Sequence, residues 1–211
     1  MESPERLLFS AAQHNNLPLL RQTLQHPRLN PNWRNPGEGW NFMTALHIAC
    51  LNGYHQVIEE LLRHPRINLN TINIYGESVF FTVCELGDAS LVELLLADQR
   101  VLVNLKTHKG QTSAWEACFQ GHVEVVELLL ESGRDIDWLD VTGPDHWEPN
   151  STPLAIARKE NNTAIVELLV AALNHEKKQL APRTSRNPVE DKGGILQGRT
   201  PESMMATVTG M

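Results

Sequence analysis

The sequence predicts an all-α solenoid, in which short helix-turn-helix units stack in a row and β-hairpin-like fingers join them. Three observations support this fold class. The phrase HPRLNPN at residues 26–32 returns as HPRINLN at residues 64–70. A glycine or asparagine recurs at a regular spacing along the chain, which is typical of structural repeats. These residues are Asn15, Gly53, Gly87, Gly121 and Asn161. Apolar residues with the spacing of one helical face follow each of them.

Each unit is expected to contain two helices and a descending loop. The first helix has small residues such as Ala49 and Cys50 on one face. The glycine or asparagine then adopts a left-handed conformation that reverses the chain. The second helix has one apolar stripe, as in Val57, Ile58, Leu61 and Leu62, and again in Val125, Val126, Leu129 and Leu130. One unit cannot bury this stripe alone, so several must stack. The paired helices are expected within residues 8–24, 46–62, 80–96, 114–130 and 154–170.

The repeat resembles a known family. TALHIACLNGYHQVIEELL at residues 44–62 is similar to the ankyrin pattern of TPLHxAA, Gly-His and a VVxLL helix, and GHVEVVELLLESG at residues 121–133 matches it more closely. The resemblance covers about residues 5–173. It implies an ankyrin-repeat domain over residues 1–173, with five units at about 5–38, 39–72, 73–106, 107–140 and 141–173.

The departures from the family pattern are also informative. The Thr–His hydrogen bond of the TPLH slot is expected only between Thr44 and His47, since Phe81 and Trp115 replace the histidine in the next two units. Longer connections predict two enlarged fingers, at 32–43 and 137–151. From residue 174 to 211 the periodicity stops, so we expect a disordered tail, with a short helical continuation to about Leu180.

Composition and charge restrict the classes of partner. The chain has 211 residues and a net charge of -7. Residues 174–211 contain six cations and four anions, which leaves -9 on residues 1–173. An acidic body of this kind argues against nucleic acid and anionic membranes as partners. No apolar run has the roughly 18 residues of a membrane helix, and the N-terminus does not resemble a signal peptide. Three cysteines are an odd number, which suits a reducing compartment, so we expect the chain in the cytoplasm, the nucleus or both. We also expect a monomer.

Residues that could suggest chemistry have simpler explanations in the repeat. Cys50, Cys84 and Cys118 are each 34 residues apart, so they are expected to fill one buried slot in three units rather than to share a zinc ion. No His-x-x-x-His pair occurs among the nine histidines. GGILQGRT at residues 193–200 has Arg199 where a phosphate-binding loop has lysine. We therefore expect no cofactor, no metal site and no enzymatic activity.

The resemblance implies a binding surface on the finger tips and the exposed side of the first helices. Large apolar groups on a concave face rimmed by charge are typical of an interaction site. The alternative is that the long fingers fold over these groups as local packing, as expected for Phe81 and Trp115. Carried over slot by slot, the partner-binding residues are Trp40, Asn41, Met43, Leu51, Asn52, Ile74, Tyr75, Glu77, Glu85, Leu86, His108, Lys109, Gln111, Phe119, Gln120, His146, Trp147, Lys159 and Glu160.

These residues predict a non-catalytic module for protein–protein interaction. Trp40, Tyr75, Leu86 and Phe119 are the expected anchors, and Glu77 with Glu85 favours a partner segment that is both basic and apolar. The alternative is a substrate-recruiting adaptor in ubiquitination or another modification pathway, in which the tail recruits the machinery. Deleting residues 174–211 would separate the two hypotheses.

Overall fold

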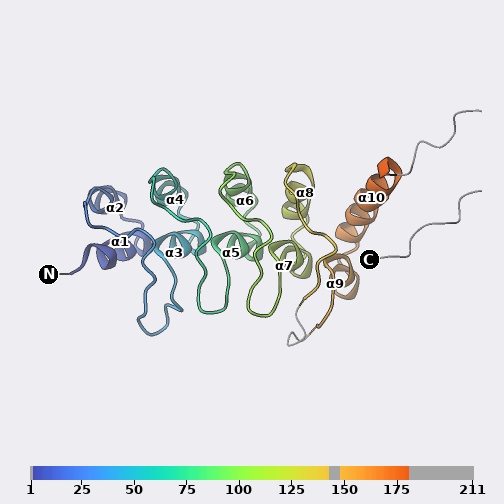
Figure 1. Cartoon of the computed structure of the whole chain (residues 1–211), viewed down its shortest axis with the longest axis horizontal. Coiled ribbons are helices and arrows are strands. Elements are labelled where there is room, and N and C mark those ends of the chain that lie inside the picture. Colours follow the sequence, from blue (N-terminus) through green and yellow to red (C-terminus); the bar gives the residue numbers. More distant parts are fainter. Residues whose placement is uncertain (1, 143–147, 181–211) are drawn as a thin grey trace, which may run out of the picture.

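The computed structural model describes residues 2–142 and 148–180 of the chain. Within these ranges ten helices form five antiparallel pairs, stacked in a row (Figure 1). The helices are α1 (Pro4–Gln13), α2 (Leu17–Leu24), α3 (Ala45–Leu51), α4 (His55–Leu62), α5 (Val79–Leu86), α6 (Ala89–Leu96), α7 (Ser113–Gln120), α8 (Val123–Glu131), α9 (Pro153–Lys159) and α10 (Thr163–Leu180). The odd-numbered inner helices and the even-numbered outer helices form two layers, and the fingers project beside the inner layer (Figure 1). The predicted all-α solenoid is confirmed.

Local chemistry sets both ends of the inner helices. Their N-cap residues have extended backbones, and each side-chain hydroxyl accepts a hydrogen bond from the backbone N–H three residues later. These caps are Ser3, Thr44, Ser78, Thr112 and Thr152. Every glycine or asparagine that the sequence assigns to the reversal has a positive φ, between 52° at Asn15 and 82° at Gly121. The left-handed reversals are therefore confirmed in all five units.

The predicted bond of the second unit is present. The Thr44 hydroxyl donates to His47 Nδ1 at 2.8 Å, and His47 Nε2 donates to the carbonyl oxygen of Glu77, 3.3 Å away in the next unit. Burial lowers the pKa of His47 to about 4, since the charged imidazolium is poorly solvated there. His47 is therefore a neutral bridge between two units at ordinary pH.

Stacking buries the apolar stripes of the outer helices. Val57, Ile58 and Leu61 are completely buried. The fourth position of the stripe is only half-buried, at Leu62 and at Leu130, because it lies at the edge of the contact with the next unit. In the inner helices, Cys50, Cys84 and Cys118 are buried at equivalent positions, as the packing interpretation requires. No group of three or more histidine, cysteine, aspartate or glutamate side chains suited to a metal occurs in the described residues.

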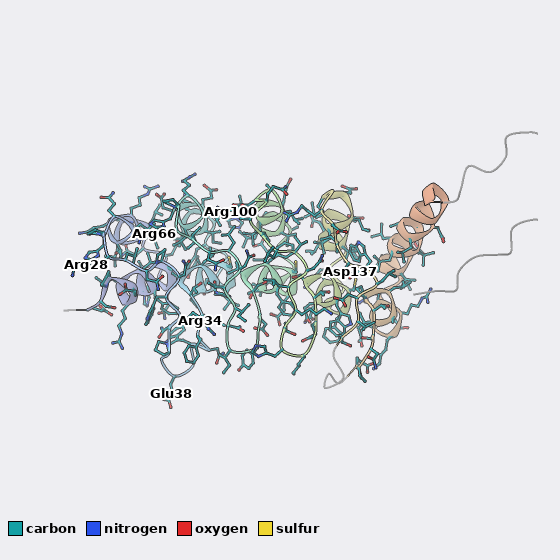
Figure 2. All side chains as sticks on the ribbon, in the orientation of Figure 1. Arg28, Arg34, Glu38, Arg66, Arg100 and Asp137 are labelled. Atoms are coloured by element: carbon teal, nitrogen blue, oxygen red, sulfur yellow. The ribbon has the colours of Figure 1, made fainter. Side chains whose placement is uncertain are left out.

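A ladder of asparagines joins the descending loops of successive units. Each side-chain amide donates to a backbone carbonyl of the next unit and accepts from a backbone N–H two residues further along it. The donated bonds run from Asn32 to Arg66, from Asn70 to Arg100 and from Asn104 to Asp135, at 2.7–2.8 Å. The accepted bonds come from Asn68, Leu102 and Asp137. Figure 2 labels Arg66 and Arg100 along this edge of the stack. These hydrogen bonds hold successive units at a fixed spacing, and two of the three asparagines, Asn32 and Asn70, end the two copies of the repeated phrase.

A closing hydrogen bond defines each finger and reveals its length. The short fingers close from Asn73 N to Glu77 O and from Thr107 N to Gln111 O. The first finger closes from Asn35 N to Met43 O and the fourth from Thr142 N to Ser151 O, so both contain extra residues. The only bridge of the β type in the described residues pairs Ile72 with Ser78, so the fingers are hairpin-like without regular strands.

The last helix, α10, continues to Leu180. The helical continuation expected beyond residue 173 is thus present, and residues 174–180 of the predicted tail are helical. The rest of that tail, from residue 181, lies outside the described residues, as do His146 and Trp147 of the fourth finger.

Candidate interaction surface

The first three fingers form one continuous row because backbone hydrogen bonds join the first to the second and the second to the third. The amide of Ile74 donates to the carbonyl of Asn41 at 2.9 Å, and the amide of His108 donates to the carbonyl of Tyr75 at the same distance. Gly76 lies flat against the His108 backbone and ring, where a Cβ atom would approach within 2.6 Å. These fingers and the exposed ends of α3, α5 and α7 together make up what we name the concave face.

Five large apolar side chains of the described residues are exposed on the concave face, of which Phe42, on the first finger, is described below. Ile74 (43% exposed) and Tyr75 (51%) lie on the second finger. Leu51 (37%) is the last residue of α3, and Leu86 (45%) is the last residue of α5. Since burying each of them against a partner removes apolar area from water, they are the groups here that association would stabilise most.

A hollow of about 150 Å³ separates the second finger from the third. Its walls are Ile74, Tyr75, Glu77, Thr107, His108, Lys109 and Gln111. Six of these seven residues were predicted from the sequence as partner-binding residues, and the structure brings them together around a single depression. The side chain of one apolar residue has a size suited to such a hollow.

Two of the expected anchors are only partly available. Trp40 is half-buried, with its ring edge-to-face against Phe9 of α1 at 5.1 Å between centroids, although it also lines a hollow of about 330 Å³ beside α1. Phe119 is half-buried and stacks on the buried Trp115 at 5.5 Å. Both rings therefore pack within the fold, and the apolar exposure of the concave face is centred on its second finger.

The other predicted residues have mixed surroundings. Asn41, Met43, Glu77, Glu85 and Gln111 are half-exposed, whereas Asn52, His108, Lys109, Gln120, Lys159 and Glu160 are exposed. Lys159 forms an ion pair with Glu148 of the fourth finger, so its charge is engaged within the chain. Phe81 and Trp115 are 3% and 1% exposed, and the Trp115 indole N–H donates to the Ser151 hydroxyl at 2.8 Å.

Phe42 is a surface residue that the sequence analysis did not single out. It precedes the closing residue Met43 of the first finger, as Gly76 and Gly110 precede those of the short fingers, and all three have positive φ. Its ring is 42% exposed, and the Arg34 guanidinium lies 5.3 Å from the ring centroid. Figure 2 labels Arg34 on this finger and Glu38 at its tip. Because the first finger contains extra residues, sequence spacing alone did not align Phe42 with Gly76 and Gly110.

Glu116 is the second residue that sequence reasoning missed. It occupies the position in α7 that Ile48, Thr82 and Ile156 hold in the other inner helices, and it is only 4% exposed. Gln111 Nε2 and Gln120 Nε2 each donate to one of its carboxylate oxygens, at 3.0 and 2.9 Å. Burial raises its pKa to about 7, with smaller contributions from Glu85 and Glu77. The sequence signal was a carboxylate in a slot that otherwise holds an uncharged side chain.

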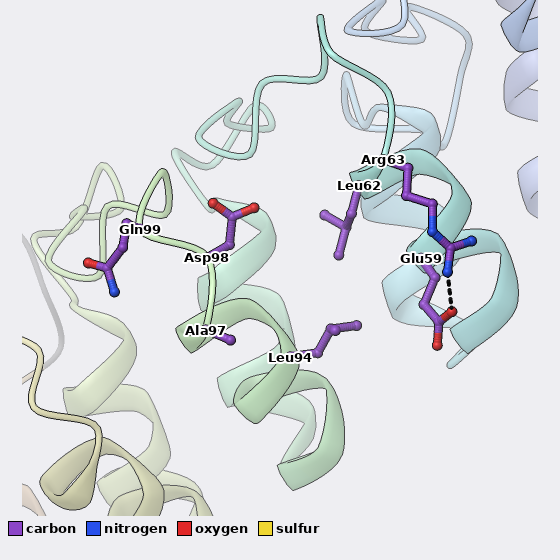
Figure 3. A pocket seen from close by; sticks show the side chains of 7 residues that line it. All are labelled: Glu59, Leu62, Arg63, Leu94, Ala97, Asp98 and Gln99. Carbon is purple, nitrogen blue, oxygen red and sulfur yellow. Dashed lines mark hydrogen bonds and ion pairs between the residues drawn. The ribbon is translucent and has the colours of Figure 1, made fainter.

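A larger hollow lies away from the concave face. It opens between the C-terminal ends of α4 and α6, measures about 470 Å³, and is lined by Glu59, Leu62, Arg63, Leu94, Ala97, Asp98 and Gln99 (Figure 3). Arg63 pairs with Glu59 at 3.1 Å and Asp98 pairs with Arg100 at 2.7 Å. Because its charges are already paired within the chain, this hollow offers less to select a charged partner than the concave face does.

Comparison with known families agrees with the geometry. The family model for ankyrin repeats, in its three-copy form, matches residues 8–100 and 66–140. A comparison with curated proteins finds no match. None of the described helices is both long and apolar enough to span a membrane.

Proposed function

Because the chain belongs to the ankyrin-repeat family, whose members generally act as protein–protein interaction modules, we propose that it binds a protein partner through its concave face. The module is non-catalytic, as is typical of this fold. Within this face, we propose that the partner contacts the fingers and the ends of α3, α5 and α7.

The row of exposed apolar groups supports this proposal. Ile74 and Tyr75 line a hollow that an apolar side chain would fill, and Leu51 and Leu86 are exposed at the ends of the neighbouring helices α3 and α5. The hydrogen bonds between fingers and the asparagine ladder hold these groups in fixed positions before binding. A rigid surface loses little conformational entropy when it binds, so more of the contact energy appears as affinity.

The adaptor hypothesis depends on residues 174–211, and nothing in the described residues favours it over simple binding. Truncation after Leu180 tests it without removing α10. An adaptor would keep its partner and lose recruitment of the modifying machinery, whereas a simple binding module would behave as the full chain does.

A pull-down from native lysate tests the concave face. The test variant carries Tyr75→Ala and Leu86→Ala. The matched control carries Leu102→Ala and Leu139→Ala, which remove leucines that are 55% and 71% exposed and lie outside the second finger and α5. We expect the test variant to lose proteins that the wild type and the control both enrich, while all three keep the same helical circular dichroism. Equal recovery by the test variant and the wild type would refute the assignment to this face.

A further inference from the structure

The middle of the concave face combines apolar exposure with three carboxylates. Glu77 lines the hollow between the second and third fingers, and Glu85 is adjacent in sequence to the exposed Leu86. Glu116 lies beneath them, behind the amide groups of Gln111 and Gln120. Gln111 also lines the hollow, so its side chain links the buried carboxylate directly to the wall of that depression.

No cation in the described residues neutralises these carboxylates. Neither Glu77, Glu85 nor Glu116 takes part in an ion pair there, although Glu77 accepts a hydrogen bond from the Asn73 amide at 2.6 Å. Lys109 and His108 also line the hollow, and neither forms an ion pair with the three carboxylates. The concave face therefore retains an uncompensated negative charge next to its largest apolar exposure.

The elements packed around α7 add no such cation. In α5, Glu85 is itself acidic, and its carbonyl oxygen accepts a hydrogen bond at 2.8 Å from His122 Nε2 at the start of α8. In α9, Arg158 and Lys159 are exposed, and Lys159 pairs with Glu148. The described residues therefore supply no positive charge that pairs with Glu77 and Glu85.

Building on the proposed function, we propose that the partner is an extended protein segment that presents one arginine or lysine side chain to Glu77 and Glu85. An adjacent apolar side chain of the same segment enters the hollow beside Ile74 and Tyr75. Charge complementarity selects this occupant, because two half-exposed carboxylates attract a cation and repel an acidic segment. An arginine has the further advantage of donating to both carboxylates from one planar group.

Glu116 would make the affinity for this segment depend on pH. Burial, then Glu85 and Glu77, raise the pKa of Glu116 to about 7, and burial with Glu77 also raises that of Glu85. A cation bound above them favours the ionised carboxylates, so binding releases a proton. Affinity for the cationic segment should consequently increase as pH rises from 6 to 8, and Glu116→Gln should flatten that increase.

Short fluorescein-labelled peptides test the proposal by anisotropy. Their central residue is arginine, lysine, citrulline or glutamate, and the flanking residues cover all combinations of leucine, phenylalanine and tyrosine. We expect the arginine and lysine peptides to bind the wild type at least about tenfold more tightly than their citrulline and glutamate counterparts. Glu77→Gln/Glu85→Gln should remove this preference, and Lys109→Ala should increase it. Glu124→Gln, which changes an exposed carboxylate of α8, is the control and should change nothing.

Three results would overturn the inference. One is equal binding of the arginine, citrulline and glutamate peptides, or no detectable binding of any, in which case the partner does not carry the proposed side chain. Another is an unchanged preference in Glu77→Gln/Glu85→Gln, which would place the cation elsewhere. A pH dependence of binding that survives in Glu116→Gln would show that Glu116 does not release the proton. If Tyr75→Ala/Leu86→Ala still loses its lysate partner while these charge tests fail, the proposed function stands and only the partner chemistry is wrong.

Discussion

The buried carboxylate of Glu116 gives the fold a measurable dependence on pH, which Glu116→Gln should remove. The substitution keeps the size of the side chain and deletes its charge. The new amide would face the N–H groups of Gln111 and Gln120, and one of them must turn over to restore a hydrogen bond. Gln120 is exposed at the end of α7 and reorients at little cost.

The sign and size of the effect follow from the pKa. Glu116 titrates near 7 in the folded chain and near its ordinary value of 4.5 when unfolded, so the folded state holds the proton more tightly. This stabilisation is fully present below pH 4.5 and is lost as the pH rises to about 7. Since one pKa unit corresponds to about 1.4 kcal/mol, the difference between 4.5 and about 7 amounts to about 3 kcal/mol of lost stability. Glu116→Gln should thus be within about 1 kcal/mol of the wild type at pH 5 and exceed it by up to about 3 kcal/mol at pH 8.

Urea denaturation followed by circular dichroism measures this difference. The wild-type curve alone is not sufficient, because His47 acts in the opposite direction over a similar pH range. Subtracting the wild type from the variant at each pH cancels the contribution of His47. Glu124→Gln, on the exposed face of α8, serves as the control and should follow the wild type at both pH values. A constant difference between Glu116→Gln and the wild type from pH 5 to pH 8 would refute the reasoning.

Three further predictions concern the contacts that position the concave face. Asn70→Ala removes two hydrogen bonds to the next unit and should lower the free energy of unfolding by about 1–2 kcal/mol in urea. Gly76→Ala should lower the melting temperature more than Gly39→Ala, because both glycines have φ near 80° but only Gly76 lies against His108; equal losses would contradict this. His47→Gln should reduce the loss of stability as pH falls from 6.5 towards 4, since acid otherwise protonates the neutral ring in its buried site. If the variant and the wild type lose the same free energy of unfolding over this pH range, His47 is not responsible for the loss.

The repeating elements were predictable because each depends on local chemistry. A residue that reverses the chain needs a positive φ, so Asn15 and Gly53 could be assigned from their type and spacing alone. The caps that the structure shows at Thr44 and Thr112 depend on equally local chemistry, because their hydroxyls bond within three residues. The Thr44–His47 bond could also be placed, since both of its partners belong to one helical turn.

The surface was harder to predict because exposure depends on distant segments. Trp40 was expected to be an anchor, but whether its ring faces solvent is decided by Phe9, in a different unit. Phe119 was expected to act likewise, but its ring lies on Trp115; this contact is local, and the spacing of four residues within one helix could have indicated it. The sequence marks Glu116 as a carboxylate in an otherwise uncharged slot, but it does not show how completely the neighbouring units cover that slot. Burial of an acid is a property of the stack rather than of the repeat pattern.

Phe42 and Glu116 both break the pattern of the repeat, and both belong to the region proposed to bind. A bulky residue with φ of 57° is strained by about 1–2 kcal/mol. A cation–π contact between exposed groups, such as that with Arg34, returns only about 0.5–1 kcal/mol. Local rules tend to be broken where a protein functions, so we expect Phe42 to contact the partner.

Comparing Phe42→Gly with Phe42→Ala isolates the strain, because both variants lose the ring and Arg34 contact alike. Glycine adopts the left-handed backbone freely and alanine does not, so the glycine variant should be more stable by about 1 kcal/mol in urea denaturation. Both should recover less of the lysate partner than the wild type. If the alanine variant proves as stable as the glycine variant, the backbone is unstrained in solution. Unreduced recovery by both would show that the aromatic ring at this position is not required for binding.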